Sequence, residues 1–116
     1  MSIRKYLTGF ATALAFTTVV TAPGVAAPTF TPWGLITQMQ VGWVVDRMLV
    51  WQGNGPLTNP DGCSIVTNGY IINETDADHK TVYAMLLSAQ LNQRRVTLLI
   101  SGCYYDRPRI ISVAIQ

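Results

Sequence analysis

The sequence predicts one mainly β domain with a single helix, and three observations support this. Apolar and polar residues alternate with a period of two in several short segments, which is typical of strands with one buried face. Only one segment, residues 75–91, has the three- and four-residue apolar spacing of an amphipathic helix. The chain of 116 residues is 49% hydrophobic and 12% charged. These values suit one small globular domain and exclude a disordered chain or a coiled coil.

The N-terminal segment, residues 1–27, has the pattern of a secretory signal peptide. Arg4 and Lys5 precede an apolar run at residues 6–20, and the small residues that end the segment fit a cleavage site. The alternative is a retained membrane anchor, but the run is short for a full span and a Pro-Gly pair interrupts it. We therefore expect a secreted or periplasmic domain of residues 28–116 that is not an integral membrane protein after cleavage.

The charge balance argues against nucleic acid as a partner. The chain has 8 basic and 6 acidic residues, but Arg4 and Lys5 leave with the signal peptide, so the mature chain is close to neutral. A protein that follows phosphates needs an excess of clustered cations. Two Cys and one His are too few for a structural zinc site or an iron–sulfur cluster. We expect no nucleic-acid partner, no metal and no cofactor.

The only two cysteines, Cys63 and Cys103, are expected to form a disulfide, because an even count in an exported protein favours pairing. The bond would close a loop of about 40 residues, for which the chain-entropy model gives about 4 kcal/mol. The alternative is a nucleophilic thiol paired with His79. Such a site needs a third, orienting residue, and none is evident nearby.

The first half of the mature chain is expected to contain an extended lead-in and three strands. The lead-in covers residues 28–34, and the turn-rich segment 52–62 is a loop. The strands cover 35–41, 44–51 and 63–72, and the alternative for the third strand is a break at Asn68-Gly69. The first strand is expected to place alternate residues on one face, namely Leu35, Thr37, Met39 and Val41.

The helix is expected to begin with Thr75 as its N-cap, since Asp78 lies three residues further on and acidic residues suit the positive end of the helix dipole. Residues 92–95 end it. One apolar stripe faces the core, consisting of Val82, Met85, Leu86 and Ala89, and it is widened by Tyr83, Leu87 and Leu91.

The last two strands, residues 95–101 and 110–115, form a hairpin closed by the turn at residues 104–107. The register that puts all apolar partners on one face pairs Val96 with Ile115, Leu98 with Val113, and Ile100 with Ile111. It places Arg95 and Arg107 at opposite ends of the hairpin.

Five short strands with a helix between the third and the fourth predict an OB-fold, a partly open Greek-key barrel. The alternative is an open α+β sheet with the helix packed on one face.

The stretch Ile-Thr-Gln-Met-Gln-Val-Gly at residues 36–42, followed by Asp46, resembles the start of the cell-binding subunits of subtilase-type and typhoid-type bacterial toxins. The similarity continues through the helix and into residues 95–100. Short motifs around both cysteines and in the helix also resemble small secreted bacterial proteins. The resemblance implies an OB-fold, rings of five copies and binding of host glycans. Pro32 stands where that family has a glycan-contacting serine, so no binding residue is carried over.

The residues expected to contact a ligand are Trp43, Tyr104, Tyr105 and Arg107. Trp43 follows a turn glycine and the tyrosines lie on the final hairpin, so their rings are expected to be partly exposed and available for stacking on sugars or proteins. The alternative role of each ring is ordinary packing, in the core or between subunits. For the charged pairs Asp46-Arg47 and Asp106-Arg107, the alternative is that they are solvated residues of turns with no binding role.

No arrangement in the sequence indicates catalysis, since His79 neighbours only helix-capping acids and no nucleophile motif is present. We expect a non-enzymatic binding module that is glycan-binding and homo-oligomeric, like a toxin B subunit. The alternative is a module for a protein partner, such as an inhibitor, an immunity-type protein or a structural secreted protein. Asn73-Glu74-Thr75 also matches a glycosylation acceptor.

Overall fold

The structure is a computed structural model that describes residues 26–43, 47–53 and 55–116. The predicted signal peptide therefore lies almost entirely outside the described residues. The described chain is mostly β with one helix, as predicted, but it contains six strands instead of five. These elements are β1 (Thr29–Phe30), β2 (Gly34–Val41), β3 (Met48–Gln52), β4 (Tyr70–Ile72), α1 (His79–Leu91), β5 (Arg95–Tyr104) and β6 (Arg107–Ile115).

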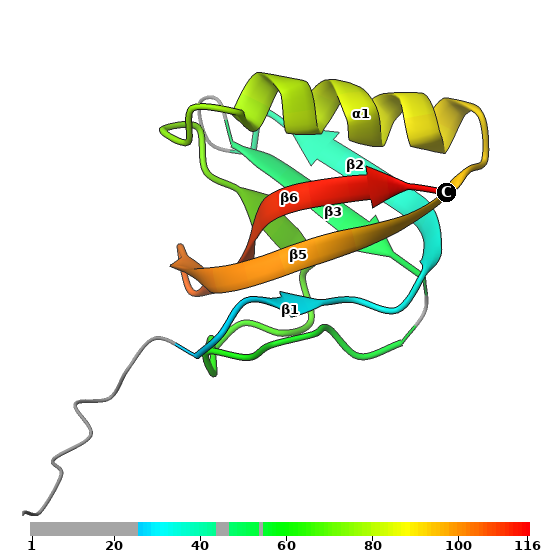
Figure 1. Cartoon of the computed structure of the whole chain (residues 1–116). Helices are drawn as coiled ribbons and strands as arrows, with labels where there is room; N and C mark the ends of the chain where they lie inside the picture. Colours follow the sequence, from blue (N-terminus) through cyan, green and yellow to red (C-terminus); the bar gives the residue numbers. More distant parts are fainter. Residues whose placement is uncertain (1–25, 44–46, 54) are drawn as a thin grey trace, which may run out of the picture.

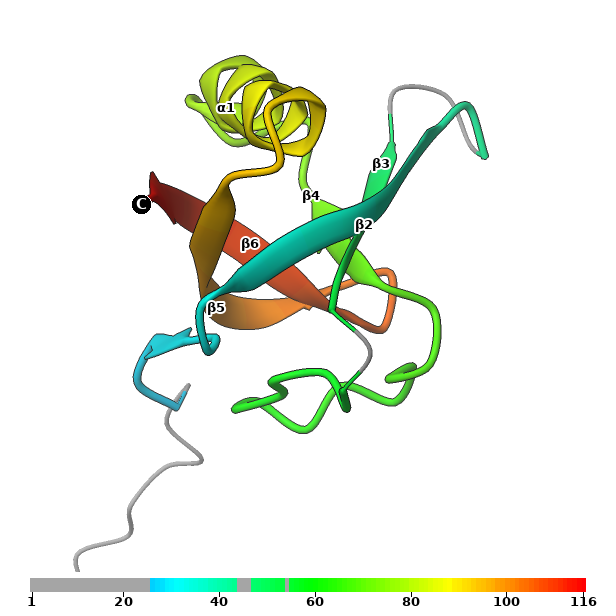
Figure 2. The same cartoon turned by 90° about the vertical axis from the view of Figure 1, so that its right-hand side faces the viewer.

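Five of the strands are linked in a ring of pairings. From β5 the ring runs through β2, β3, β4 and β6 and returns to β5, while β1 pairs with β5 further along the edge that β2 uses. All pairs are antiparallel except β4 with β6, which meet in parallel at Ile71 and Arg109. Figure 2 shows the strands around a common interior, with α1 across one end.

The interior is filled by apolar side chains from every strand of the ring and from α1. Its most deeply buried members include Val50, Ile72, Leu86, Val96, Leu98, Ile100 and Ile110. Burial of such side chains stabilises a fold by about 1.5–3 kcal/mol each. In Figure 1, α1 lies above β2, β5 and β6. It presents Val82, Leu86 and Ala89 to the core, while the predicted stripe residues Met85 and Leu91 are exposed.

The predicted lead-in is partly a strand. Thr29 and Phe30 pair with Ile100 and Leu99. Thr31 continues the contact, since its hydroxyl accepts from the Leu98 N–H at 2.9 Å and its carbonyl accepts from the Thr97 hydroxyl at 2.6 Å. These bonds satisfy buried polar groups on β5, which explains why a segment without strand periodicity lies along it.

A register shift changes the predicted faces of β2. A shift between Ile36 and Gln38 interrupts the alternation of β2, so that Ile36 is buried and Met39 packs against the core. The prediction that Met39 shares a face with the other odd-numbered residues and opposes Ile36 was therefore wrong, because an inserted residue re-aims the strand.

The β5–β6 register confirms Val96 with Ile115 and Leu98 with Val113, but Ile100 pairs with Ile110 and not with Ile111. A register shift between Leu99 and Ile100 causes this difference, and it buries Ile110 in the core. Arg95 and Arg107 lie at opposite ends of the hairpin, as predicted.

The predicted strands at 44–51 and 63–72 are shorter in the structure. Residues 44–46 lie outside the described residues, and β3 begins at Met48. Residues 63–69 do not form a strand, and the Ile65 N–H donates to the Asp106 carbonyl at 2.8 Å outside any sheet ladder. The Asn59 side chain accepts from the Cys63 N–H at 2.8 Å and donates to the Cys63 carbonyl at 2.9 Å.

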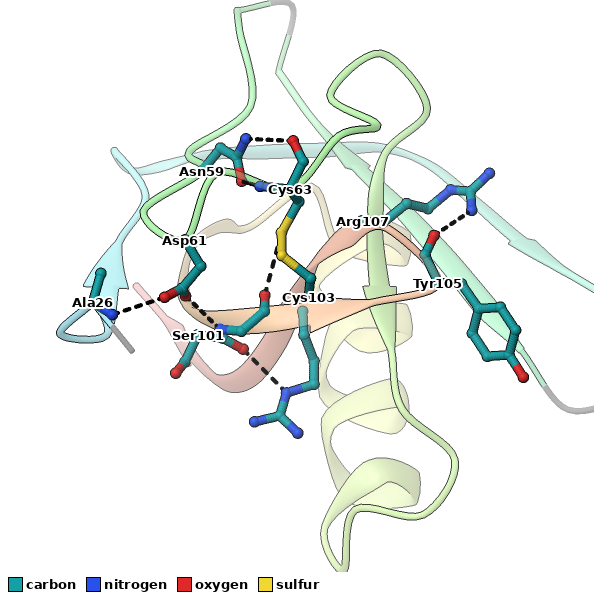
Figure 3. Close-up of a disulfide and its surroundings, with 10 residues drawn as sticks. Ala26, Asn59, Asp61, Cys63, Ser101, Cys103, Tyr105 and Arg107 are labelled. Atoms are coloured by element: carbon teal, nitrogen blue, oxygen red, sulfur yellow. Dashed lines mark hydrogen bonds between the residues drawn. A yellow bond between two sulfur atoms is a disulfide. The ribbon is translucent and has the colours of Figure 1, made fainter. Parts of the chain in front are cut away.

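The long segment between β3 and β4 is attached to the ring by the predicted disulfide. Cys63 and Cys103 are bonded, with their Cα atoms 5.6 Å apart. Asp61 adds a second attachment (Figure 3), since its carboxylate accepts from the Gly102 N–H at 2.6 Å and the Ala26 N–H at 2.8 Å. The loop is therefore held at the end of β5 without strand pairing.

Helix α1 begins later than predicted. Thr75 is not the N-cap. Its N–H and hydroxyl both donate to the Asn73 side-chain oxygen, which forms an Asx turn before the helix. The cap position is Asp78, whose side chain makes no capping bond. The predicted end is confirmed, since Asn92 is the C-cap.

Gly69 is expected to be irreplaceable for steric reasons. Its φ is +78°, and a Cβ there would lie 2.9 Å from the Trp51 ring. We predict that Gly69→Ala lowers the free energy of unfolding by about 2–4 kcal/mol in urea denaturation. Gly62 is the matched control, with φ +64° and nothing within 4 Å of the added Cβ. Gly62→Ala should cost only about 1–2 kcal/mol. Equal losses for the two variants would contradict the clash with Trp51.

Candidate functional site

Side chains of the β2–β3 and β5–β6 hairpins stack on each other. Trp43 follows β2 and Arg47 precedes β3, while Tyr105 lies in the β5–β6 turn and Arg107 begins β6. The guanidinium carbon of Arg47 is 3.1 Å from the centre of the Tyr105 ring. That of Arg107 is 4.4 Å from the centre of the Trp43 ring. Each hairpin thus supplies one ring and one arginine, and each arginine covers the ring of the other hairpin.

Tyr104 and Glu74 extend this arrangement toward α1. The Tyr104 ring meets the Tyr105 ring edge-on, with centres 4.6 Å apart. Its hydroxyl donates to Glu74 Oε1 at 2.7 Å. We call this set the hairpin cluster. Its members are Trp43, Arg47, Glu74, Tyr104, Tyr105 and Arg107.

The backbone at the tip of the cluster is strained. Tyr105 and Asp106 have φ values of +47° and +60°, as a two-residue type I′ turn requires. Such values cost about 1–2 kcal/mol per non-glycine residue. Figure 3 shows the contact that holds the turn, in which Arg107 Nη1 donates to the Tyr105 carbonyl at 3.0 Å. Stacking with Arg47 adds a favourable contact of about 0.5–2 kcal/mol.

Three polar atoms of the cluster are buried without a hydrogen-bond partner. They are Arg47 Nε, Arg107 Nε and Glu74 Oε2. Arg107 as a whole is only 4% exposed. An unsatisfied buried polar group costs about 1–3 kcal/mol, and more when it is charged. All three such atoms found in the described chain therefore belong to one cluster, which carries an energetic cost that a different arrangement or a bound molecule would relieve.

The hydrogen bond between Tyr104 and Glu74 shifts both side chains. It is the main cause that holds the pKa of Glu74 below its usual value, with a smaller contribution from the charge of Arg47. The same bond, with burial second, raises the pKa of Tyr104 to about 12. At neutral pH the pair is therefore a tyrosine donor and a carboxylate acceptor.

A groove of about 620 Å³ lies beside the cluster, between the β2–β3 hairpin and the first turns of α1. It is lined by Val41, Gly42, Met48, Glu74, His79, Lys80 and Tyr83. Its volume is in the range of small-molecule sites. Glu74 belongs to both the groove and the hairpin cluster, so the two form one continuous region.

The structure brings together the four residues that the sequence singled out, namely Trp43, Tyr104, Tyr105 and Arg107. Trp43 and Tyr105 are each 46% exposed, in keeping with the predicted partial exposure. The alternative of a solvated turn residue is wrong for Arg107, which is buried against the Trp43 ring. Asp46 lies outside the described residues.

Arg47 and Glu74 were not expected at this site. The sequence indicates Arg47 only as a turn charge and Glu74 only as the middle residue of the Asn73-Glu74-Thr75 motif. The sequence contains an Asp-Arg pair at residues 46–47 and again at residues 106–107. That repetition was the one available signal that the two arginines have equivalent places.

Other residues lie outside the hairpin cluster, although His79 lines the groove beside it. Asn73 is buried, 9% exposed, and its side-chain oxygen is engaged by Thr75, so it is not an accessible glycosylation acceptor. His79 lies at the start of α1, with Nδ1 2.6 Å from the Asp76 carbonyl oxygen. Asp76 faces Arg109 at 3.5 Å. Tyr70 is a core residue, whose hydroxyl accepts from the Thr58 N–H.

Within residues 26–43, 47–53 and 55–116, no three His, Cys, Asp or Glu side chains are grouped as metal ligands. No helix of this part of the chain is long and apolar enough to cross a bilayer.

Comparison of the chain with protein-family models, with curated proteins and with solved structures finds no match in any of the three. The geometry of the site is therefore the basis for a functional proposal.

The tyrosine–carboxylate pair should be visible in an alkaline titration. Because folding raises the pKa of Tyr104, its protonated form contributes stability that is present below about pH 10 and is lost as the pH approaches 12. We predict one tyrosine of the five whose tyrosinate absorbance develops only near pH 12. Glu74→Gln should move that transition back toward pH 10, since the charged acceptor is gone. Tyr104→Phe should remove it, and an unchanged titration in Tyr104→Phe would contradict the assignment.

Proposed function

We propose that the chain is a secreted, non-enzymatic binding module with an OB-fold that holds a saccharide at the hairpin cluster. Support for the OB-fold is the ring order of β2 to β6 together with a helix between β4 and β5 that covers one end. Support for export is the disulfide between Cys63 and Cys103, since such bonds persist in oxidising compartments. The resemblance to toxin B subunits belongs to the same proposal.

The observation that carries the proposal is the combination, in one cluster, of two half-exposed aromatic rings with three polar atoms that lack partners. A sugar ring has an apolar C–H face that stacks on Trp or Tyr, and hydroxyls that both donate and accept. Arg107 offers donors beside the Trp43 ring, while Arg47 and Glu74 carry an unpaired donor and an unpaired acceptor that a rearrangement around a ligand can pair. A polyhydroxylated ligand can stack on the rings and also form hydrogen bonds in the cluster, whereas a purely apolar ligand can only stack.

The proposed site differs in position from the one that the toxin resemblance implies. Pro32 precedes β2, whereas Trp43 follows its other end. The Pro32 carbonyl accepts from the Gln52 side-chain amide at 2.9 Å, so this residue has a structural contact of its own.

Protein-partner binding is a second candidate, supported by a row of exposed apolar side chains around β1. Phe30, Trp33 and Leu35 are 59%, 47% and 44% exposed, and β1 is the outermost strand in the order of pairings. An unpaired strand edge beside apolar side chains favours pairing with another chain, either a different protein or a second copy.

Saccharide binding is tested by isothermal titration of the purified protein with methyl glycosides of glucose, galactose, mannose, N-acetylglucosamine and sialic acid. We predict that at least one of these binds and that Trp43→Ala weakens its binding about tenfold, which corresponds to about 1.4 kcal/mol. Trp33→Ala is the matched control, because Trp33 is 47% exposed but lies at the opposite end of β2. An absence of heat with every glycoside would contradict the proposal.

The second candidate predicts self-association through the β1 region. Sedimentation should give a mass of several chains for the parent protein, and Phe30→Ser combined with Leu35→Ser should reduce it to a single chain. Leu91→Ser, on the exposed side of α1, should leave the mass unchanged. A single-chain mass for the parent protein at high concentration would contradict self-association and leave a different protein as the partner.

A further inference from the structure

In the hairpin cluster, the unpaired polar atoms and one face of the Tyr105 ring are covered and closed to a ligand. The three unpaired atoms have no contact with solvent in the described structure. A ligand therefore cannot reach them while the cluster keeps its present arrangement. At the same time, the Arg47 guanidinium lies 3.1 Å from the centre of the Tyr105 ring, where the face of a sugar would stack. Arg47 thus occupies a place that the proposed ligand needs.

Glu74 is a charged acceptor in the same cluster that can receive Arg47 when it leaves the ring. Tyr104 lies between them, since its ring touches the Tyr105 ring that Arg47 covers and its hydroxyl binds Glu74 Oε1. Glu74 Oε2 is the unpaired acceptor and Arg47 Nε is an unpaired donor. The charge of Arg47 already acts on Glu74, since it contributes to the lowered pKa of that carboxyl.

We propose that Arg47 is a displaceable occupant of the Tyr105 ring, and that saccharide binding moves its guanidinium onto Glu74 Oε2. The inference rests on the proposed saccharide function. One movement frees the aromatic face, pairs two buried atoms that lack partners, and opens the boundary between the cluster and the groove that Glu74 lines. Arg107 stays in place as the fixed arginine, because its Nη1 is bonded to the Tyr105 carbonyl.

The proposal assigns separate roles to the residues. Trp43 and Tyr105 contact the saccharide. Glu74 is a positioning residue, which acts by holding Arg47 away from the ring, and Tyr104 orients Glu74 through its hydroxyl. The site therefore discriminates between ligands by whether their contacts with Tyr105 outweigh the stacking of Arg47, which is worth about 0.5–2 kcal/mol.

The test follows the arginine Nε–H signals in NMR spectra of the ¹⁵N-labelled protein, with and without whichever methyl glycoside of the panel binds. A guanidinium on a ring face is shifted by the ring current. Without glycoside, the Arg47 signal should be shifted upfield, and Tyr105→Leu should remove the shift. With saturating glycoside, the upfield shift should be lost in the parent protein and the Arg107 signal should stay in place.

Two substitutions separate the roles by affinity. Glu74→Gln removes the charged acceptor for Arg47, so the affinity for the same methyl glycoside should fall about tenfold. Arg47→Ala removes the competitor, so the affinity should be equal to or higher than that of the parent protein. Arg95→Ala is the matched control, since Arg95 is an exposed arginine at the other end of the β5–β6 hairpin, and it should change neither the spectra nor the affinity.

The outcomes distinguish this inference from the function on which it rests. If no glycoside binds the parent protein, the saccharide function itself is wrong. If a glycoside binds but the Arg47 signal does not move and Glu74→Gln binds equally well, the displacement is overturned while the function stands. A loss of affinity in Arg47→Ala would also overturn it, because Arg47 would then be a direct ligand contact.

Discussion

Strand β5 is the constraint on which the rest of the structure depends. It pairs with β1, β2 and β6, and three of its side chains, from Val96, Leu98 and Ile100, are fully buried in the interior. Its last residues carry the disulfide that attaches the long segment between β3 and β4. A chain of this size has a small core and marginal stability. One strand that organises both the sheet and the covalent closure therefore has a large share in holding the fold.

The hairpin at the end of β5 links the fold to the candidate site. Its turn holds Tyr105 in a left-handed backbone conformation, which costs free energy. Contacts with other parts of the chain offset this cost. Those contacts come from the β2–β3 hairpin, about 60 residues earlier in the chain, through Arg47 and Trp43. The stacking is thus both a structural link between two turns and the reason that two aromatic rings stand together at the surface.

The individual elements were predictable where the pattern was local. The alternation of apolar residues located β2, β5 and β6, and the turn at residues 104–107 was identified correctly. The prediction of a strand at residues 63–69 was wrong. The side chain of Asn59, which lies outside the predicted segment, binds the backbone of Cys63 instead. The helix start was misplaced by a similar competition, since Asn73 and not Thr75 organises the turn before α1. For the site, aromatic residues near turns indicated four members of the cluster, but nothing in the pattern placed Glu74 beside Tyr104.

The amino-acid sequence by itself determined the β-rich class, the single helix, the pairing of the two cysteines and the closing hairpin. These features depend on composition, on short-range periodicity and on the presence of only two cysteines. Only the tertiary structure decided the register shifts, the parallel contact of β4 with β6 that closes the ring, and the side-chain contacts between the two hairpins. The last two are contacts between segments far apart in the chain, and the register shifts depend on how each hairpin packs against the common interior, which no local pattern records.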